Sequence, residues 1–183
     1  MRGLAKRRPK GSTAKQLAVR SRFTLLSQFL LLIKGAVDRG FSNQYSGRAT
    51  AFNLAIEANQ GAFTGTDLDP QLDYSQIIIS KGFIVPKPSD CKIAEGVQGY
   101  VTVSWKAFSG AVDNLDDSAT IVLQCPEHME ALVYMDKFVR RDEVADLEIP
   151  SNWSQKTVHA YAFMTSKDGT NSATAFAGSL PIS

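Results

Sequence analysis

The 183-residue chain is predicted to be an α+β protein, with a helical N-terminal part followed by an antiparallel β-sandwich. Apolar residues recur at alternating spacings of four and three from Val19 to Val37, which is the period of one helical face. Between residues 90 and 179 the pattern changes to short β-rich runs separated by turn residues. Residues 157–165 contain no formal charge, glycine or proline and are apolar or aromatic on both alternating faces. We therefore expect this last run to form a strand that is covered on both sides.

The first helix is expected from residue 13 to the glycine at position 40. Thr13 is a good N-cap, and Gln16 completes the capping-box pattern. The apolar stripe of this helix consists of Val19, Phe23, Leu26, Leu30, Ile33 and Val37. Gly40 supplies the stop signal, and a second helix over residues 48–59 is expected to pack antiparallel to the first. So wide an apolar face must be buried, either against the body of the protein or against another chain.

Three segments follow from the composition along the chain. Residues 1–12 form a basic arm, residues 13–85 a helical pair with a strand-rich linker at 74–85, and residues 86–183 the sandwich. The boundary is placed at the proline pair of residues 86–88. The expected strands of the sandwich lie at residues 90–94, 99–106, 119–125, 131–135, 144–149, 157–165 and 173–179.

The sandwich resembles a fibronectin type III domain, within the wider class of immunoglobulin-like folds. Residues 100–105 (YVTVSW) resemble the second strand of that domain, which ends on a core tryptophan, here Trp105. Residues 147–150, 158–161 and 167–172 (LEIP, VHAY and KDGTNS) resemble its last three strands. The usual core tyrosine of the sixth strand is not matched, because Val158 stands near its position.

The whole chain is similar to a bacterial family catalogued only as a domain of unknown function. The residues that carry this resemblance are, in order, a basic segment, QLAVRSRF at 16–23, GF at 40–41, AFN at 51–53 and DYS at 73–75, followed by the sandwich. Family members usually begin with a further glycine-rich segment, which is missing ahead of the basic segment here. The resemblance implies a fold and no activity.

The residues that commonly carry chemistry give no catalytic or metal-binding pattern. Cys91 and Cys125 are too far apart in sequence for a metal motif, and we expect both to be free. His128 is expected in a solvated turn and His159 on a sheet face, while the acidic pair at Asp116 and Asp117 is expected to be solvated beside a turn. No phosphate-binding glycine motif is present. We therefore predict no enzyme activity, no cofactor and no small-molecule substrate.

The charge of the chain is strongly asymmetric. The first 22 residues carry eight basic residues and no acid, whereas the other 161 carry 12 basic and all 18 acidic residues. The candidate contact residues for a partner or for phosphate groups are Arg2, Lys6, Arg7, Arg8, Lys10, Lys15, Arg20 and Arg22. A basic arm on an acidic body predicts docking onto a protein partner or a second copy. The alternative is a nucleic-acid-associated protein whose arm binds phosphates in a salt-dependent way.

These observations favour a non-catalytic interaction or structural subunit of a larger assembly, of the cell-surface or virus-particle kind. The apolar run at residues 25–33 is far shorter than the ~20 residues that span a bilayer, and a poor cleavage site follows it. We therefore expect a structural helix there and no membrane span. The sequence assigns no compartment.

Overall fold

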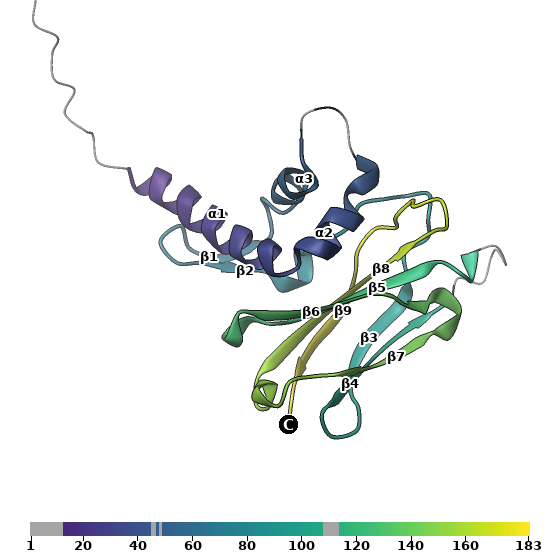
Figure 1. The fold of residues 1–183 in the computed structure, drawn as a ribbon. Helices are drawn as coiled ribbons and strands as arrows, with labels where there is room; N and C mark the ends of the chain where they lie inside the picture. Colours follow the sequence, from purple (N-terminus) through teal and green to yellow (C-terminus); the bar gives the residue numbers. More distant parts are fainter. Residues whose placement is uncertain (1–12, 45–46, 48, 108–113) are drawn as a thin grey trace, which may run out of the picture.

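The computed structural model describes residues 13–44, 47, 49–107 and 114–183, which form three layers (Figure 1). The first layer is helical and also carries a short hairpin. Its elements are α1 (Ala14–Leu32), α2 (Lys34–Gly40), η1 (Ser42–Gln44), α3 (Ala51–Ala58), β1 (Phe63–Gly65), β2 (Pro70–Leu72) and η2 (Tyr74–Gln76).

The other two layers are antiparallel sheets that form the sandwich. The sheet next to the helices has the order β6-β5-β8-β9, with bounds Glu130–Val139, Ser118–Cys125, Thr157–Thr165 and Ala175–Pro181. The outer sheet has the order β3-β4-β7, with bounds Ser89–Glu95, Tyr100–Lys106 and Val144–Glu148. Short 3-10 turns connect some of these strands, among them η4 (Pro126–His128), η5 (Arg140–Asp142) and η6 (Ser151–Trp153). The predicted α+β class is confirmed, and each of the seven expected strands has its counterpart.

The middle sheet is covered on both faces, as the sequence of its central strand predicts. Alternate residues of β8 contribute to two separate cores. Val158, Ala160, Ala162 and Met164 belong to the core between the sheets. Tyr161 and Phe163 point the other way, into the core beneath the helices. The helical layer is therefore packed directly on the sandwich through β8 and its neighbour β5.

The apolar stripe of the first helix is only partly as predicted. The capping box of Thr13 and Gln16 is present, and Leu26 and Leu30 are buried. The helix is interrupted at Ile33, whose φ of −112° and ψ of 25° lie outside the α-helical region. After this residue α2 runs in a different direction from α1 (Figure 1). The prediction of one continuous helix is therefore wrong, although the stripe is buried from Leu26 through Leu30 and Ile33 to Val37.

The expected strand over residues 74–85 is also wrong. After η2, the segment makes one isolated bridge, between Val85 and Ser172. Its backbone is satisfied by side chains, because Ile78 N–H donates to Asn59 Oδ1 at 2.7 Å. The backbone N–H groups of residues 79 and 80 donate to Thr174 Oγ1 at 2.9 and 2.8 Å. A β-rich segment whose donors find side-chain acceptors needs no neighbouring strand.

Gly40 is the last residue of α2, as expected, but it is needed there for close packing and not for a left-handed cap. A Cβ on this residue would lie 2.2 Å from the backbone oxygen of Ile79. Lys81 N–H and Ser80 Oγ–H both donate to the Gly40 carbonyl, at 3.1 and 3.2 Å. The glycine therefore allows the helix end and the 77–85 segment to approach each other closely.

Asp117 is buried, contrary to the expectation that both acids of its pair are solvated. Its side chain is 4% exposed and pairs at 3.0 Å with Arg140, which is fully buried. Arg140 also donates to the backbone oxygens of Pro86 and Asn114 at 2.7 and 3.1 Å. This ion pair joins the loop before β5 to the end of β6 and to the segment that enters the sandwich.

Candidate interaction surfaces

The beginning of α1 carries apolar side chains that the rest of the chain leaves uncovered. Val19 and Phe23 continue the stripe of Leu26, yet their exposed fractions are 65% and 56% against 2% for Leu26. In Figure 1 the first turns of α1 project beyond the end of the helical layer. The apolar stripe is therefore longer than the body that buries it.

A shallow groove lies between these first turns and α3. We call it the helical groove; it has a volume of 270 Å³ and apolar walls formed by Val19, Phe23, Leu26, Ile56 and Phe63. Arg22 and Gln60 are the polar residues of its lining. The helical groove is thus apolar at its centre and carries a cation at its edge.

The predicted basic contact residues are placed unevenly. Arg2, Lys6, Arg7, Arg8 and Lys10 lie outside the described residues, while Lys15 and Arg20 are exposed on α1. Arg22 donates to Asp67 at 2.9 Å, and its guanidinium lies 5.7 Å from the centre of the Phe63 ring. Residues two apart on a helix do not share a face, so Arg20 and Arg22 point to different sides. The α1 cations therefore do not form one continuous basic line.

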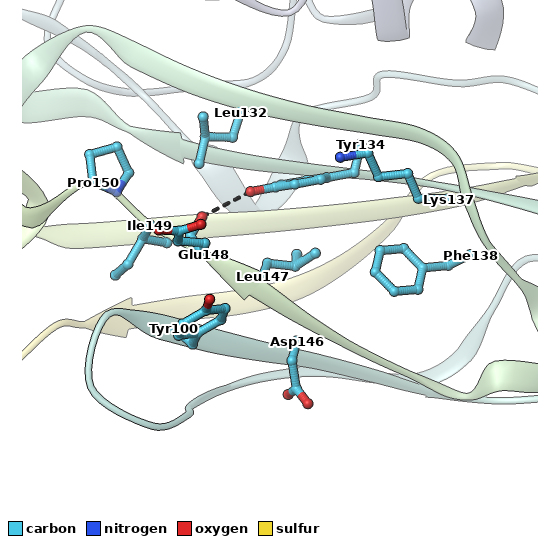
Figure 2. A pocket seen from close by; sticks show the side chains of 10 residues that line it. All are labelled: Tyr100, Leu132, Tyr134, Lys137, Phe138, Asp146, Leu147, Glu148, Ile149 and Pro150. Atoms are coloured by element: carbon cyan, nitrogen blue, oxygen red, sulfur yellow. Dashed lines mark hydrogen bonds between the residues drawn. The ribbon is translucent and has the colours of Figure 1, made fainter.

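A second surface lies where the two sheets present their edges on the same side of the sandwich. β6 and β7 each have one hydrogen-bonded neighbour in their sheets, whereas on the other side β3 and β9 are in contact. We call the hollow between β6 and β7 the edge groove; it has a volume of 460 Å³. Figure 2 shows Tyr134 reaching across it, and the Tyr134 hydroxyl donates to the Glu148 backbone oxygen at 2.9 Å. Burial raises the pKa of this phenol, so the hydroxyl stays protonated and able to donate.

The edge groove has an apolar floor, with two acidic residues on its β7 side and Lys137 on its β6 side. Leu132, Phe138, Leu147 and Ile149 line it together with Tyr134 and Tyr100. Asp146 and Glu148 are exposed on β7, and Asp146 accepts a hydrogen bond from Thr102 Oγ1 at 2.6 Å. The sequence pattern does not reveal this site, because alternation identifies each strand and not which strands end up at the sheet edges.

The backbone of β7 is available along the edge groove. The N–H of Ile149 donates to Gly99 and the N–H of Trp105 donates to Glu143, so the odd-numbered residues of β7 face β4. In an antiparallel ladder the intervening residues direct their N–H and C=O groups outward. The outward residues here are Val144, Asp146 and Glu148, and the Glu148 oxygen already accepts from Tyr134.

His159 is buried on the sheet face, as its position in the β-rich run predicts. Its Nδ1 lies 2.7 Å from Ser179 Oγ on the neighbouring strand, and its ring stacks on Tyr74 with centroids 4.0 Å apart. A catalytic triad also needs an acid that orients the base. The carboxylate of Glu127 instead accepts from the backbone N–H of Thr157 at 3.1 Å. Neither His159 nor Ser179 lines the helical groove or the edge groove.

The remaining groups with possible chemistry are separated from one another. In the part of the chain that the structure describes, no three His, Cys, Asp or Glu side chains gather in a way that could hold a metal ion. Cys91 and Cys125 are free thiols, and burial raises the pKa of Cys91 to about 12. His128 ends the 3-10 turn η4 and is half-buried. Of the helices in the described ranges, none is long and apolar enough to cross a membrane.

The stability of the chain is expected to fall between pH 7 and pH 5, in part through His159. Burial lowers the pKa of this histidine below its ordinary 6.5, an effect that the nearby Glu127 charge opposes only in part. As the pH falls, His159 is therefore protonated in the unfolded chain before it is protonated in the folded one. This difference lowers the free energy of unfolding by at most about 1.4 kcal/mol per pH unit. His159→Gln should reduce the pH-dependent loss in urea unfolding, while His128 remains in both proteins as the internal control. Equal losses at pH 5 in the variant and the parent would contradict the assignment.

Comparison with known proteins gives one family and a set of similar structures. The sequence model of a family described as "Family of unknown function (DUF6266)" matches residues 1–177. No curated protein matches the chain. It is similar to the solution structure of the fn3 domain of human collagen alpha-1(XX) chain, with 11% identity and a TM-score of 0.43 over 57% of this chain and 91% of that one. It is also similar to the central fibronectin-III array of RIM-binding protein, with 15% identity and a TM-score of 0.34 over 51% of this chain and 35% of that one.

Proposed function

The chain belongs to this family of unknown function, as its whole-length resemblance predicted, and we propose that it is a non-catalytic protein-interaction subunit that assembles with further copies of itself. The observation that carries this proposal is the uncovered beginning of the α1 stripe, at Val19 and Phe23. Fully burying a side chain of this kind is worth about 1.5–3 kcal/mol. A partner that covers both residues and fills the helical groove gains that free energy without any change in the fold.

The charges around this surface indicate what the partner must offer. Lys15 and the basic arm accompany the apolar face, so a complementary surface has an apolar centre and an acidic border. Residues 23–183 of this same chain carry 18 acidic against 12 basic residues. A second copy of the chain therefore supplies the negative charge that the basic arm requires. Repeated contacts of this kind would build a larger assembly, such as a cell-surface structure or a virus particle.

Binding of nucleic acid through residues 2–22 is the second candidate, and one observation weighs against it. Arg22 is already engaged by Asp67 and by the Phe63 ring. A phosphate contact would have to replace the carboxylate, which reduces the gain expected from that residue. Deletion of residues 1–11 and a salt series with duplex DNA would reveal such binding directly.

Replacing Val19 and Phe23 together with serine is expected to weaken self-association by about 100-fold. The two truncated side chains remove roughly 3 kcal/mol of apolar burial, and each 1.4 kcal/mol is a tenfold change in the dissociation constant. Sedimentation velocity over a dilution series measures the change. The matched control is Phe83→Ser, because Phe83 is 93% exposed and does not line the helical groove. The proposal fails when the double variant and the control associate equally.

A further inference from the structure

We propose that the edge groove of one copy receives residues 2–8 of a second copy as an added strand along β7. This inference rests on the proposed self-assembly and names the receiving surface for it. The added strand would hydrogen-bond to the outward backbone groups of Val144 and Asp146, in the manner of other edge-strand interactions.

β7 is the more regular of the two open edges. The register of β4 with β7 is continuous from Tyr100 to Ser104. On β6, by contrast, Asp136 has a φ of +59° at an irregularity in the β5–β6 register, and Lys137 follows it. Irregular register and lysine side chains discourage an edge strand from pairing with a further strand, whereas an edge strand with regular register can pair with one. The β7 side of the edge groove is therefore the side that can bind a strand.

Charge and side-chain size both match residues 2–8 to this edge. In an extended chain Arg2, Lys6 and Arg8 share one face with Leu4, and Gly3, Ala5 and Arg7 face the other way. With the first face outward, the three cations lie beside Asp146 and Glu148, and opposite charges on adjacent strands attract. On the inward face, small residues at positions 3 and 5 suit a groove whose floor Leu147 and Phe138 already occupy, and Arg7 is long enough to extend its guanidinium past that floor to solvent. This segment also contains no proline, which would remove a ladder donor.

The contact between the arm of one copy and the edge groove of the next joins two different surfaces of the protein. α1 packs on one face of the middle sheet and β7 on the other, so the two surfaces belong to opposite outer layers (Figure 1). A contact between unlike surfaces leaves one free site of each kind after two copies have joined. Such contacts continue into rings or filaments. The arm in the edge groove also brings the neighbouring start of α1 to the second copy, which can then cover Val19 and Phe23.

A charge exchange in the full chain tests this inference. One variant carries Arg2→Glu, Lys6→Glu and Arg8→Glu, and the other carries Asp146→Lys and Glu148→Lys. Each alone is expected to associate about tenfold more weakly than the parent, because like charges replace the attractive pairs. An equimolar mixture should recover association, since each arm then finds a groove of opposite sign. The matched control for the second variant is Glu57→Lys with Glu95→Lys, which makes the same change in net charge away from the edge groove.

The outcomes separate this inference from the function on which it rests. Recovery in the mixture, with the control on its own associating as the parent does, supports the edge groove as the receiving surface. No recovery, while Val19→Ser with Phe23→Ser still weakens the parent, overturns the edge groove and leaves self-assembly through α1 intact. A parent that stays monomeric overturns both. Circular dichroism of each variant verifies the fold before the masses are compared.

Discussion

Asp117→Ala is expected to lower the free energy of unfolding by about 3–5 kcal/mol. The substitution leaves the fully buried guanidinium of Arg140 without its carboxylate, which otherwise accepts at 3.2 Å from Nε and 3.0 Å from Nη2. Arg140 also donates to the Pro86 backbone, and its own carbonyl accepts from the Trp105 indole at 2.8 Å. Loss of the carboxylate therefore disturbs the contacts of Arg140 with the loop before β5, with the segment at Pro86 and with Trp105 of β4.

Urea unfolding followed by far-ultraviolet circular dichroism measures this loss. Asp90→Asn is the control, because Asp90 forms an exposed pair with Lys106 and such pairs contribute little, while asparagine tolerates the left-handed φ of +49° at this position. The double variant Asp117→Leu with Arg140→Met should regain most of the stability, since it removes both charges together. A single Asp117 variant as stable as the Asp90 variant would show that the buried pair is not needed.

Gly82→Ala is expected to destabilise the chain by about 3 kcal/mol, at the upper end of ordinary overpacking. A Cβ at this position would lie 1.7 Å from the backbone oxygen of Asn171. That backbone has little freedom to move, because Asn171 N–H donates to Asn43 at 3.1 Å and its side chain donates to the Arg39 carbonyl at 2.6 Å. The added methyl group must therefore displace the 77–85 segment from the end of α2.

Thermal unfolding measures this effect against Gly61→Ala. No atom lies within 4 Å of a Cβ built on Gly61, and its φ is not in the left-handed region, so that change should be neutral or slightly stabilising. Similar melting temperatures for the two variants would contradict the close approach at Gly82.

The features that the sequence predicts correctly depend on local alternation. The two apolar faces of β8 identify a strand with a core on each side, and Val101, Val103 and Trp105 identify the inward face of β4. The capping box at Thr13 marks the helix start to the residue. In both strands the burial of a side chain follows from its position in a periodic segment, and the cap follows from two residues three positions apart.

The features that the sequence does not predict depend on partners far along the chain. Residues 77–85 have the composition of a strand, but Asn59 and Thr174 satisfy their backbone donors instead. The burial of Asp117 depends on Arg140, 23 residues away. The edge groove depends on the order of strands in two sheets, which no local pattern contains. The candidate basic residues were identified by charge alone, and their role stays a prediction.

The most direct test of self-assembly is the mass of the full chain by light scattering, over a dilution series at low and moderate salt. A single chain has a mass of 19.9 kDa. We expect masses above this value that rise with concentration without stopping at a dimer, and that fall when salt screens the arm from the acidic edge. A mass of one chain at every concentration and salt level would contradict the proposed function, and a nucleic-acid titration would then be the next experiment.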